Sequence, residues 1–115
     1  MIKRFDEGNR MSQAVQFAGF FETAGQVTDD TTLDITGQTQ RALDAIDRLL
    51  TEANLSRNDL TRIQIWLANN DDRAAMNQVY DLWIADSKKP VRACVESTLS
   101  TPGYLVEIQA FAYRA

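Results

Sequence analysis

The chain has 115 residues, of which 44% are hydrophobic and 24% are charged, and its formal net charge is −4. This length supports one hydrophobic core, so we expect a single domain spanning residues 1–115. The acidic balance and the scattered Lys and Arg residues lack the basic stripe that is typical of nucleic-acid-binding proteins. No segment resembles a signal peptide, and no apolar run is long enough to cross a membrane. We therefore expect a soluble cytoplasmic protein.

Two scarce residue types restrict the chemistry that is open to the chain. The sequence contains no histidine and a single cysteine, Cys94. Ser-His-Asp and Cys-His catalysis, an intramolecular disulfide and a cysteine-based metal cage are therefore excluded, and the commonest zinc ligand is absent. Any catalysis must use carboxylates, Arg, Lys, hydroxyls, one thiol, backbone groups or bound water.

The first half of the chain shows strand patterns followed by a helix pattern. Residues 2–5 predict a weak short strand, and residues 14–18 and 20–26 predict two further strands. Gly25, inside the third of these strands, indicates a bulge or a close backbone approach. From about residue 34 to residue 54 the apolar residues recur every three or four positions, which predicts an amphipathic helix.

The second half alternates strand and helix patterns. Residues 61–68 alternate as a strand does, and residues 70–72 supply a cap and first-turn acids for a helix that reaches Lys88. Two more strands are predicted, at residues 91–97 and 104–113. The order βββ-α-β-α-ββ predicts an α+β fold in which a mixed sheet carries both helices on one face.

Such a sheet leaves its other face uncovered. Alternation places Arg92, Cys94 and Glu96 on one side of their strand, and it places Glu107 and Gln109 together on one side of the last strand. These sides mix polar and apolar residues, which suits neither open water nor a dry core. We expect a subunit interface with a wet pocket in it, and therefore an oligomer.

Arg92 and Glu107 are unexpected residues for strand interiors. If Pro102-Gly103 made a tight hairpin, opposed residue numbers would sum to about 205. The two side chains would then lie more than ~15 Å apart. They can share a site only if another strand lies between their strands, or if a neighbouring subunit supplies one of them.

Five segments carry a recognisable pattern in the same order along the chain. PVRACVESTLSTPGYLVEIQAFA, at residues 90–112, contains a proline, an Arg, Cys-Val, a short loop and a Val-Glu-Ile strand. The other four are MSQAV at 11–15, TAGQV at 23–27, QTQRALDAIDRLLTEA at 38–53 and DDRAAMNQVYDLW at 71–83. Together they resemble the RidA/YjgF family of small enamine/imine deaminases over nearly the whole chain, and they are closest to its short members.

This resemblance implies a fold like Bacillus chorismate mutase, with the final strand between the third and fourth strands. It also implies a homotrimer with clefts between its subunits. In that cleft Arg92 would hold the substrate carboxylate, and Glu107 would orient or polarise a water. Cys94 and Gly25 would contribute mainly backbone groups, and Asn77 would line or support the pocket.

Two positions depart from the family's pattern. Met11 stands where many relatives have an aromatic residue before Ser-Gln, so an aromatic wall and a tyrosine hydroxyl are missing from the expected substrate-binding residues. Ala24 stands where a Ser commonly precedes the glycine, which removes a hydrogen bond.

The chemistry that the resemblance implies suits a chain without histidine. A 2-imino acid, such as 2-iminopropanoate or 2-iminobutanoate, is already electrophilic at its imine carbon. The protein must hold the carboxylate, place a water at about 3 Å from that carbon, and move protons. Arg92 can pair with a carboxylate through two parallel N–H groups, and partial burial would raise the pKa of Glu107. The products are a 2-keto acid and ammonia, and no metal or organic cofactor is required.

Alternative interpretations remain for each residue and for the whole protein. Arg92 and Glu107 could form a structural ion pair, and Asn77 could serve only to bond a neighbouring loop. Cys94 is a poor candidate nucleophile because no base is available to activate its thiol. The protein could instead bind a small carboxylate without catalysis. A ribonuclease or translation-inhibitor activity is the third alternative, and the acidic charge counts against it.

Overall fold

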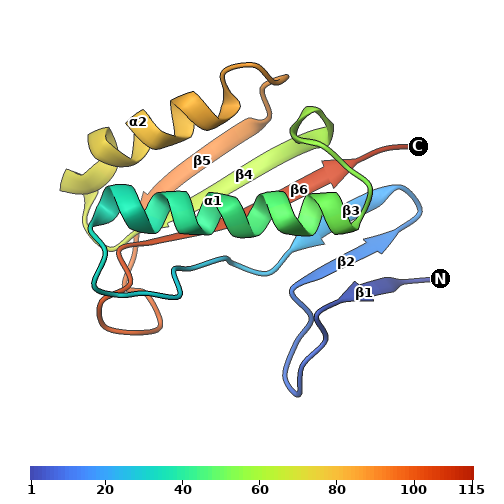
Figure 1. The fold of residues 1–115 in the computed structure, drawn as a ribbon, viewed down its shortest axis with the longest axis horizontal. Coiled ribbons are helices and arrows are strands. Elements are labelled where there is room, and N and C mark those ends of the chain that lie inside the picture. Colours follow the sequence, from blue (N-terminus) through green and yellow to red (C-terminus); the bar gives the residue numbers. More distant parts are fainter.

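The computed structural model describes residues 1–115 as one six-stranded sheet with two helices on one of its faces (Figure 1). The elements are β1 (Lys3–Phe5), β2 (Ala14–Phe17), β3 (Phe20–Thr23), α1 (Ile35–Glu52), β4 (Leu60–Leu67), α2 (Arg73–Ile84), β5 (Val91–Glu96) and β6 (Val106–Tyr113). This sequence of elements confirms the predicted order and the α+β fold class. Neither helix is both long and apolar enough to span a membrane.

The strand order in the sheet is β1-β2-β3-β6-β4-β5. β4 and β5 are parallel and are connected by α2, whereas the other neighbouring strands are antiparallel. A parallel pair needs such a crossover because its two strands start at the same end of the sheet. β6 therefore lies between β3 and β4, and the last two strands do not form a hairpin, as the family resemblance implied.

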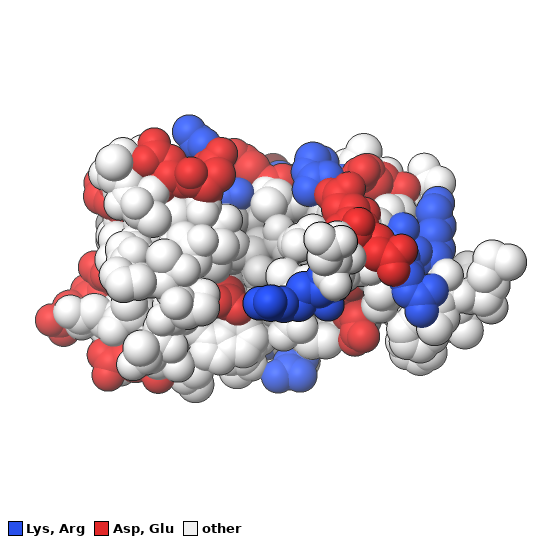
Figure 2. Space-filling view, turned by 90° about the horizontal axis from the view of Figure 1, so that it is seen from below, with Lys and Arg blue, Asp and Glu red and all other residues white.

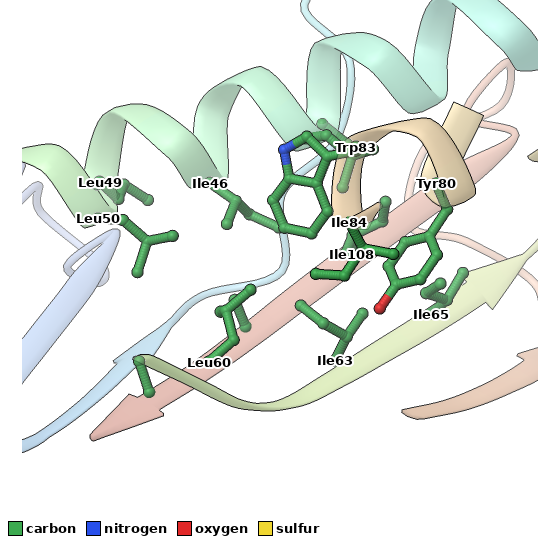
Figure 3. Close-up of a cluster of buried hydrophobic side chains, with 14 of the residues drawn as sticks. Ile46, Leu49, Leu50, Leu60, Ile63, Ile65, Tyr80, Trp83, Ile84 and Ile108 are labelled. Carbon is green, nitrogen blue, oxygen red and sulfur yellow. The ribbon is translucent and has the colours of Figure 1, made fainter. Parts of the chain in front are cut away.

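The core fills the space between the sheet and the helices (Figure 3). β4 contributes Ile63, Ile65 and Leu67, which are fully buried because alternate residues of this strand point to the helices. In α1, apolar residues spaced three or four positions apart lie on one face of the helix, and this face packs against the sheet. Its fully or almost fully buried residues include Ala42, Leu43, Ile46, Leu49 and Leu50. The periodicities in the sequence thus identify the side chains that pack together.

The end of α2 differs from the prediction. The helix ends at Ile84 rather than at Lys88, because the chain needs residues 85–90 to turn back into β5, which runs parallel to β4. Lys89 lies beyond the helix, and its Nζ donates to the carbonyl oxygens of Ile84, Ala85 and Ser87 at 3.0, 3.1 and 2.7 Å. This lysine satisfies carbonyl groups that the shortened helix leaves without partners.

The pairing between β3 and β6 contains the irregularity that Gly25 predicted. Glu22 pairs with Phe111, whereas Gln26 forms an isolated bridge with Ile108. Four steps along one strand therefore match three steps along the other, which is the pattern of a bulge. For this reason β3 ends at Thr23 instead of residue 26. β6 begins at Val106 instead of residue 104, and Val106 pairs with Leu67, the last residue of β4.

A buried glutamine fixes the loop that leads into β6. Gln38 is fully buried at the start of α1, and its side-chain amide donates to the carbonyl oxygens of Leu33 at 3.1 Å and Gly103 at 2.9 Å. Its Oε1 accepts from the backbone N–H of Leu105 at 2.9 Å. These bonds hold the chain two residues before Glu107.

Candidate functional site

The two charged residues of the predicted site lie on opposite faces of the sheet. Arg92 of β5 is paired with Ile63 of β4, and Glu107 of β6 is paired with Trp66 of the same strand. Ile63 and Trp66 are three positions apart, so their side chains, and those of their partners, point to opposite faces. Arg92 faces the helices, and Glu107 lies on the uncovered face.

The separation of these two residues follows from the same register. β4 lies between β5 and β6, so the backbones of Arg92 and Glu107 are two strand spacings apart and three residues apart along the strands. With about 4.8 Å between neighbouring strands and about 3.3 Å per residue along a strand, the Cα atoms of Arg92 and Glu107 are about 14 Å apart. A strand between them does exist, but it does not bring the side chains together. No ion pair joins them within the chain.

On the helix side, Arg92 contacts two residues of α2. Its Nη1 donates to Asn77 Oδ1 at 2.7 Å, and its Cζ lies 4.8 Å from the centroid of the Tyr80 ring. Asn77 and Tyr80 are three positions apart on α2, so they share one face of the helix. The edge formed by Nε and Nη2 has no partner within the chain and remains free for a planar anion. Asn77 thus contacts Arg92, the residue that is predicted to bind the substrate carboxylate.

Tyr80 was not among the predicted site residues. The signal that could have found it is its helical spacing from Asn77, since both residues must face the same neighbouring strand. Which strand that would be depends on the β4-α2-β5 crossover, and no local pattern specifies it.

Cys94 lies two residues beyond Arg92 on the same side of β5. Its thiol is free and half-buried, and it packs against the hydrophobic core. Its strand partner is Ile65, a fully buried core residue. The thiol therefore belongs to the packing of the edge strand.

On the uncovered face, Glu107 lies directly over Gly25. A Cβ atom at position 25 would overlap Glu107 Oε2 and would come within 2.7 Å of its Cδ. Burial raises the pKa of Glu107 above its ordinary value of 4.5, because a desolvated carboxylate is disfavoured in its charged form. No hydrogen bond or ion pair within the chain occupies this carboxylate, so its oxygens are free to accept from a water or a substrate.

Met11 and Ala24 lie on the same side as Glu107. With Gln109 they line a cavity of about 300 Å³, and Gln109 is two residues along β6 from Glu107 and therefore shares its face. Met11 is 53% exposed. The predicted site residues thus form two groups. The helix-side group contains Arg92, Asn77 and Cys94, and the open-face group contains Glu107, Gly25 and Met11.

The uncovered face also exposes large apolar side chains. Phe20 is 54% exposed, and Val91 and Val95 of β5 are 68% and 45% exposed. An aromatic cavity of about 420 Å³ lies on this face, and Arg62 lies over the ring of Phe111 in its wall, with 5.1 Å between Cζ and the ring centroid. A mixed face of this kind is typical of a subunit interface rather than of free surface.

Basic and acidic side chains are interspersed on the face drawn in Figure 2. Figure 2 shows that the Lys and Arg groups on one face are separated by Asp, Glu and uncharged residues, without a continuous basic track. No three His, Cys, Asp or Glu side chains are grouped so that they could hold a metal ion. The face drawn in Figure 2 therefore carries no continuous basic track.

The sequence and the fold both match known proteins over almost their full length. The family model described as Endoribonuclease L-PSP matches residues 1–114. A RutC family protein of Haemophilus ducreyi is 37% identical over 108 residues, which cover 94% of this chain and 92% of that protein.

Two crystal structures have the same fold. A YjgF-family protein of Neisseria meningitidis is 34% identical with a TM-score of 0.95, and the match covers 100% of this chain and 96% of that one. A YjgF-family protein of Mycobacterium tuberculosis is 27% identical with a TM-score of 0.90, covering 99% and 100%. Both the helix-side group and the open-face group lie within the matched region.

Proposed function

Because the chain belongs to the RidA/YjgF family, we propose that it hydrolyses reactive 2-imino acids and their enamine tautomers. The substrates would be of the 2-aminoacrylate/2-iminopropanoate type, and the products would be 2-keto acids and ammonia. The observation that carries the proposal is that both Arg92 and Glu107 have hydrogen-bonding capacity that no residue of the chain uses. A guanidinium held by Asn77 keeps one edge free for a carboxylate, and a carboxyl group of raised pKa has no partner within the chain.

The proposed site requires more than one copy of the chain. Since the helix-side and open-face groups point away from each other in one subunit, they can meet only across an interface. We propose a homotrimer in which the β5 edge of one subunit brings Arg92 to the face of its neighbour that carries Glu107. The exposed apolar residues of that face, including Phe20 and Val95, support such contact.

In this arrangement each residue has one task. Arg92 binds the substrate carboxylate and fixes the imine carbon in place. Glu107 accepts a proton from water while the water oxygen bonds to that carbon, and it passes this proton to the imine nitrogen, which gives a 2-amino-2-hydroxy acid. Glu107 then takes the hydroxyl proton and delivers it to the amino nitrogen, the C–N bond breaks, and ammonia leaves as the ketone forms. Backbone groups at Cys94 and Gly25 complete the pocket.

A trapping assay tests the activity. An amino-acid oxidase or a PLP-dependent dehydratase generates the imino acid, and semicarbazide captures the imine that has not yet been hydrolysed. Substoichiometric wild-type protein should lower semicarbazone formation and speed keto-acid and ammonia release. The Arg92→Ala and Glu107→Gln proteins, added at the same concentration, should leave semicarbazone formation almost unchanged. If wild-type protein leaves the semicarbazone yield unchanged for several amino acids but still binds pyruvate, the chain is a carboxylate-binding protein and not a hydrolase.

The family model is described as an endoribonuclease, so ribonuclease activity is the remaining candidate. The net charge of −4 and the interrupted basic groups in Figure 2 argue against strong binding to a phosphate backbone. RNA cleavage that survives Arg92→Ala and disappears on further purification would come from a contaminant. Cleavage that copurifies with the protein and is lost in Arg92→Ala would instead support this second function.

A further inference from the structure

A buried aromatic ring lies beneath the exposed Arg92. Tyr80 is only 6% exposed, although Arg92 itself is exposed on the edge strand. Figure 3 shows its ring reaching from α2 down to the sheet beside Ile63 and Ile65. Ile63 is the strand partner of Arg92, and the Arg92 Cζ lies 4.8 Å from the centroid of the Tyr80 ring. This distance is within the range of a cation–π contact.

We propose that Tyr80 is a positioning residue for substrate binding, and that its ring restrains the guanidinium of Arg92 for a substrate carboxylate. Asn77 supplies the second point of restraint through its 2.7 Å hydrogen bond with Nη1. Together they leave the Nε–Nη2 edge as the free pair of parallel donors. This inference rests on the proposed function, because it assigns to Tyr80 a task in the clamp that the proposed function places at Arg92.

The position of Arg92 explains why it needs such support. β5 is the last strand of the sheet, so Arg92 has a neighbouring strand on one side only. An unsupported arginine there would occupy many rotamers, and binding would have to pay for ordering them. The contact with Tyr80 and the bond with Asn77 order the side chain before substrate arrives, which lowers the cost of binding.

The ring, rather than the hydroxyl, carries this role. The Tyr80 hydroxyl has no hydrogen-bond partner within the chain, and the hydrogen bond of Arg92 goes to Asn77 instead. Burial raises the pKa of Tyr80, so the phenol is neutral at physiological pH and cannot act as a counter-ion to Arg92. A phenylalanine ring at this position would keep the contact, whereas an aliphatic side chain of similar burial would lose it.

A second Arg–aromatic pair, between Arg57 in the turn before β4 and Trp83 of α2, serves as a matched control. Arg57 lies over the ring of Trp83 at 4.9 Å, and Trp83 is also 6% exposed. Arg57, however, makes two hydrogen bonds with Asp47, at 2.9 and 2.7 Å, and a third with the Trp83 carbonyl oxygen at 2.6 Å. These bonds connect the turn before β4 to α1 and α2, and they leave no edge of the Arg57 guanidinium free for a ligand.

The first test measures the order of the Arg92 side chain without any ligand. In full-length protein labelled with ¹⁵N-arginine, the heteronuclear NOE of the Arg92 Nε–H should indicate a rigid group in wild type and in Tyr80→Phe. The same group should be mobile in Tyr80→Leu. The Trp83→Leu control should lower the melting temperature while Arg92 stays rigid. A rigid Arg92 in Tyr80→Leu, or a mobile one in Tyr80→Phe, would overturn the inference.

The second test measures the consequence for binding. Tyr80→Leu should raise the Kd of pyruvate and the KM for 2-iminopropanoate by about 5- to 30-fold, the range expected for a partly desolvated cation–π contact. The kcat should change by less than about threefold, since the lost contact acts on carboxylate binding. Tyr80→Phe should restore both constants to within about threefold of wild type. A fall in kcat at constant KM in Tyr80→Leu would refute a positioning role.

The two proposals fail in different ways. If wild-type protein hydrolyses no imine but Arg92 order and pyruvate affinity follow the ring at position 80, the positioning role stands and the catalytic function falls. If imines are hydrolysed but Tyr80→Leu leaves both Arg92 order and KM at wild-type values, the positioning role falls and the catalytic function stands.

Discussion

The carboxylate of Glu107 occupies the space in which a side chain at position 25 would begin. A Cβ on Gly25 would overlap Glu107 Oε2, and the bulge between β3 and β6 brings the two residues to this distance. Gly25 does not need the left-handed conformation that only glycine adopts easily, because its φ is not among the positive values of this chain. The glycine therefore serves to make room for the carboxylate.

This relationship predicts the effect of Gly25→Ala. The obstructing atoms, Oε2, Cδ and Cγ, all belong to one flexible side chain, so this side chain should rotate away while the fold is retained. We expect imine hydrolysis to fall by about 10²-fold, because a displaced base no longer reaches the attacking water. The melting temperature should change by only a few degrees. Wild-type kcat in a Gly25→Ala protein would show that the present position of Glu107 has no role in the reaction.

The raised pKa of Glu107 predicts a pH dependence of the rate. As a general base Glu107 must be ionised, so kcat/KM should rise with pH through a midpoint above the ordinary value of 4.5. The rate of uncatalysed imine hydrolysis must be subtracted at each pH. Glu107→Gln should abolish this acid limb together with most of the activity. An acid limb that persists in the Gln variant would have to come from another group.

Because of the same pKa shift, lowering the pH should slow the reaction but stabilise the folded protein. Between 4.5 and the folded-state pKa, the folded chain holds more protons at Glu107 than the unfolded chain does. Lowering the pH through this window therefore stabilises the folded state with respect to this group. Glu107→Gln should remove the contribution, which denaturant unfolding at several pH values can measure for the two proteins side by side.

The opposite faces of Arg92 and Glu107 predict complementation between two inactive variants. Arg92→Ala and Glu107→Gln should each be inactive alone. When both chains are coexpressed in equal amounts, about a quarter of the interfaces in random trimers should combine an intact Arg92 with an intact Glu107 from the neighbour. About a quarter of wild-type activity should return, and light scattering should show trimers. Monomeric protein, or mixed trimers without activity, would refute a shared site.

Arg92→Lys separates a bidentate clamp from simple charge attraction. Lysine keeps the charge but loses the planar pair of donors at the free Nε–Nη2 edge, so hydrolysis should fall by about 10- to 1000-fold while the oligomer and fold are retained. Arg92→Ala should be more impaired and should bind pyruvate or benzoate more weakly. If Arg92 is a structural interfacial ion instead, Arg92→Ala should break the oligomer or lower its melting temperature. Calorimetry and light scattering on both variants distinguish these cases.

Cys94→Ala tests whether the thiol takes part in the reaction. The thiol packs against the core and no base within the chain activates it, so we expect activity within about tenfold of wild type, or about 1.4 kcal/mol in the barrier. Removing the half-buried sulfur should cost only a small amount of stability. A loss of a thousandfold or more, in a protein that still forms the wild-type oligomer, would mean that the sulfur contacts the reacting atoms.

Local patterns in the sequence determined the elements and their order. Helix periodicity identified the buried side of α1, and alternation correctly separated Arg92 and Cys94 from Val91 and Val95 along β5. These patterns are readable because each depends on residues that are near in sequence and face the same neighbour. The boundaries at Gly25 and at the end of α2 were less accurate, since a bulge and a helix end depend on what the chain packs against.

The sequence by itself therefore determined which residue types the site contains, through the absence of histidine and through the segments that resemble the RidA/YjgF family. Only the tertiary structure decided how these residues are combined. The register of β5 and β6 on β4 places Arg92 and Glu107 on opposite faces, and the α2 crossover places Tyr80 beneath Arg92. Strand pairing and crossover join residues that are far apart in sequence. Their relative orientation depends on the register of a third strand, β4, which no local periodicity contains.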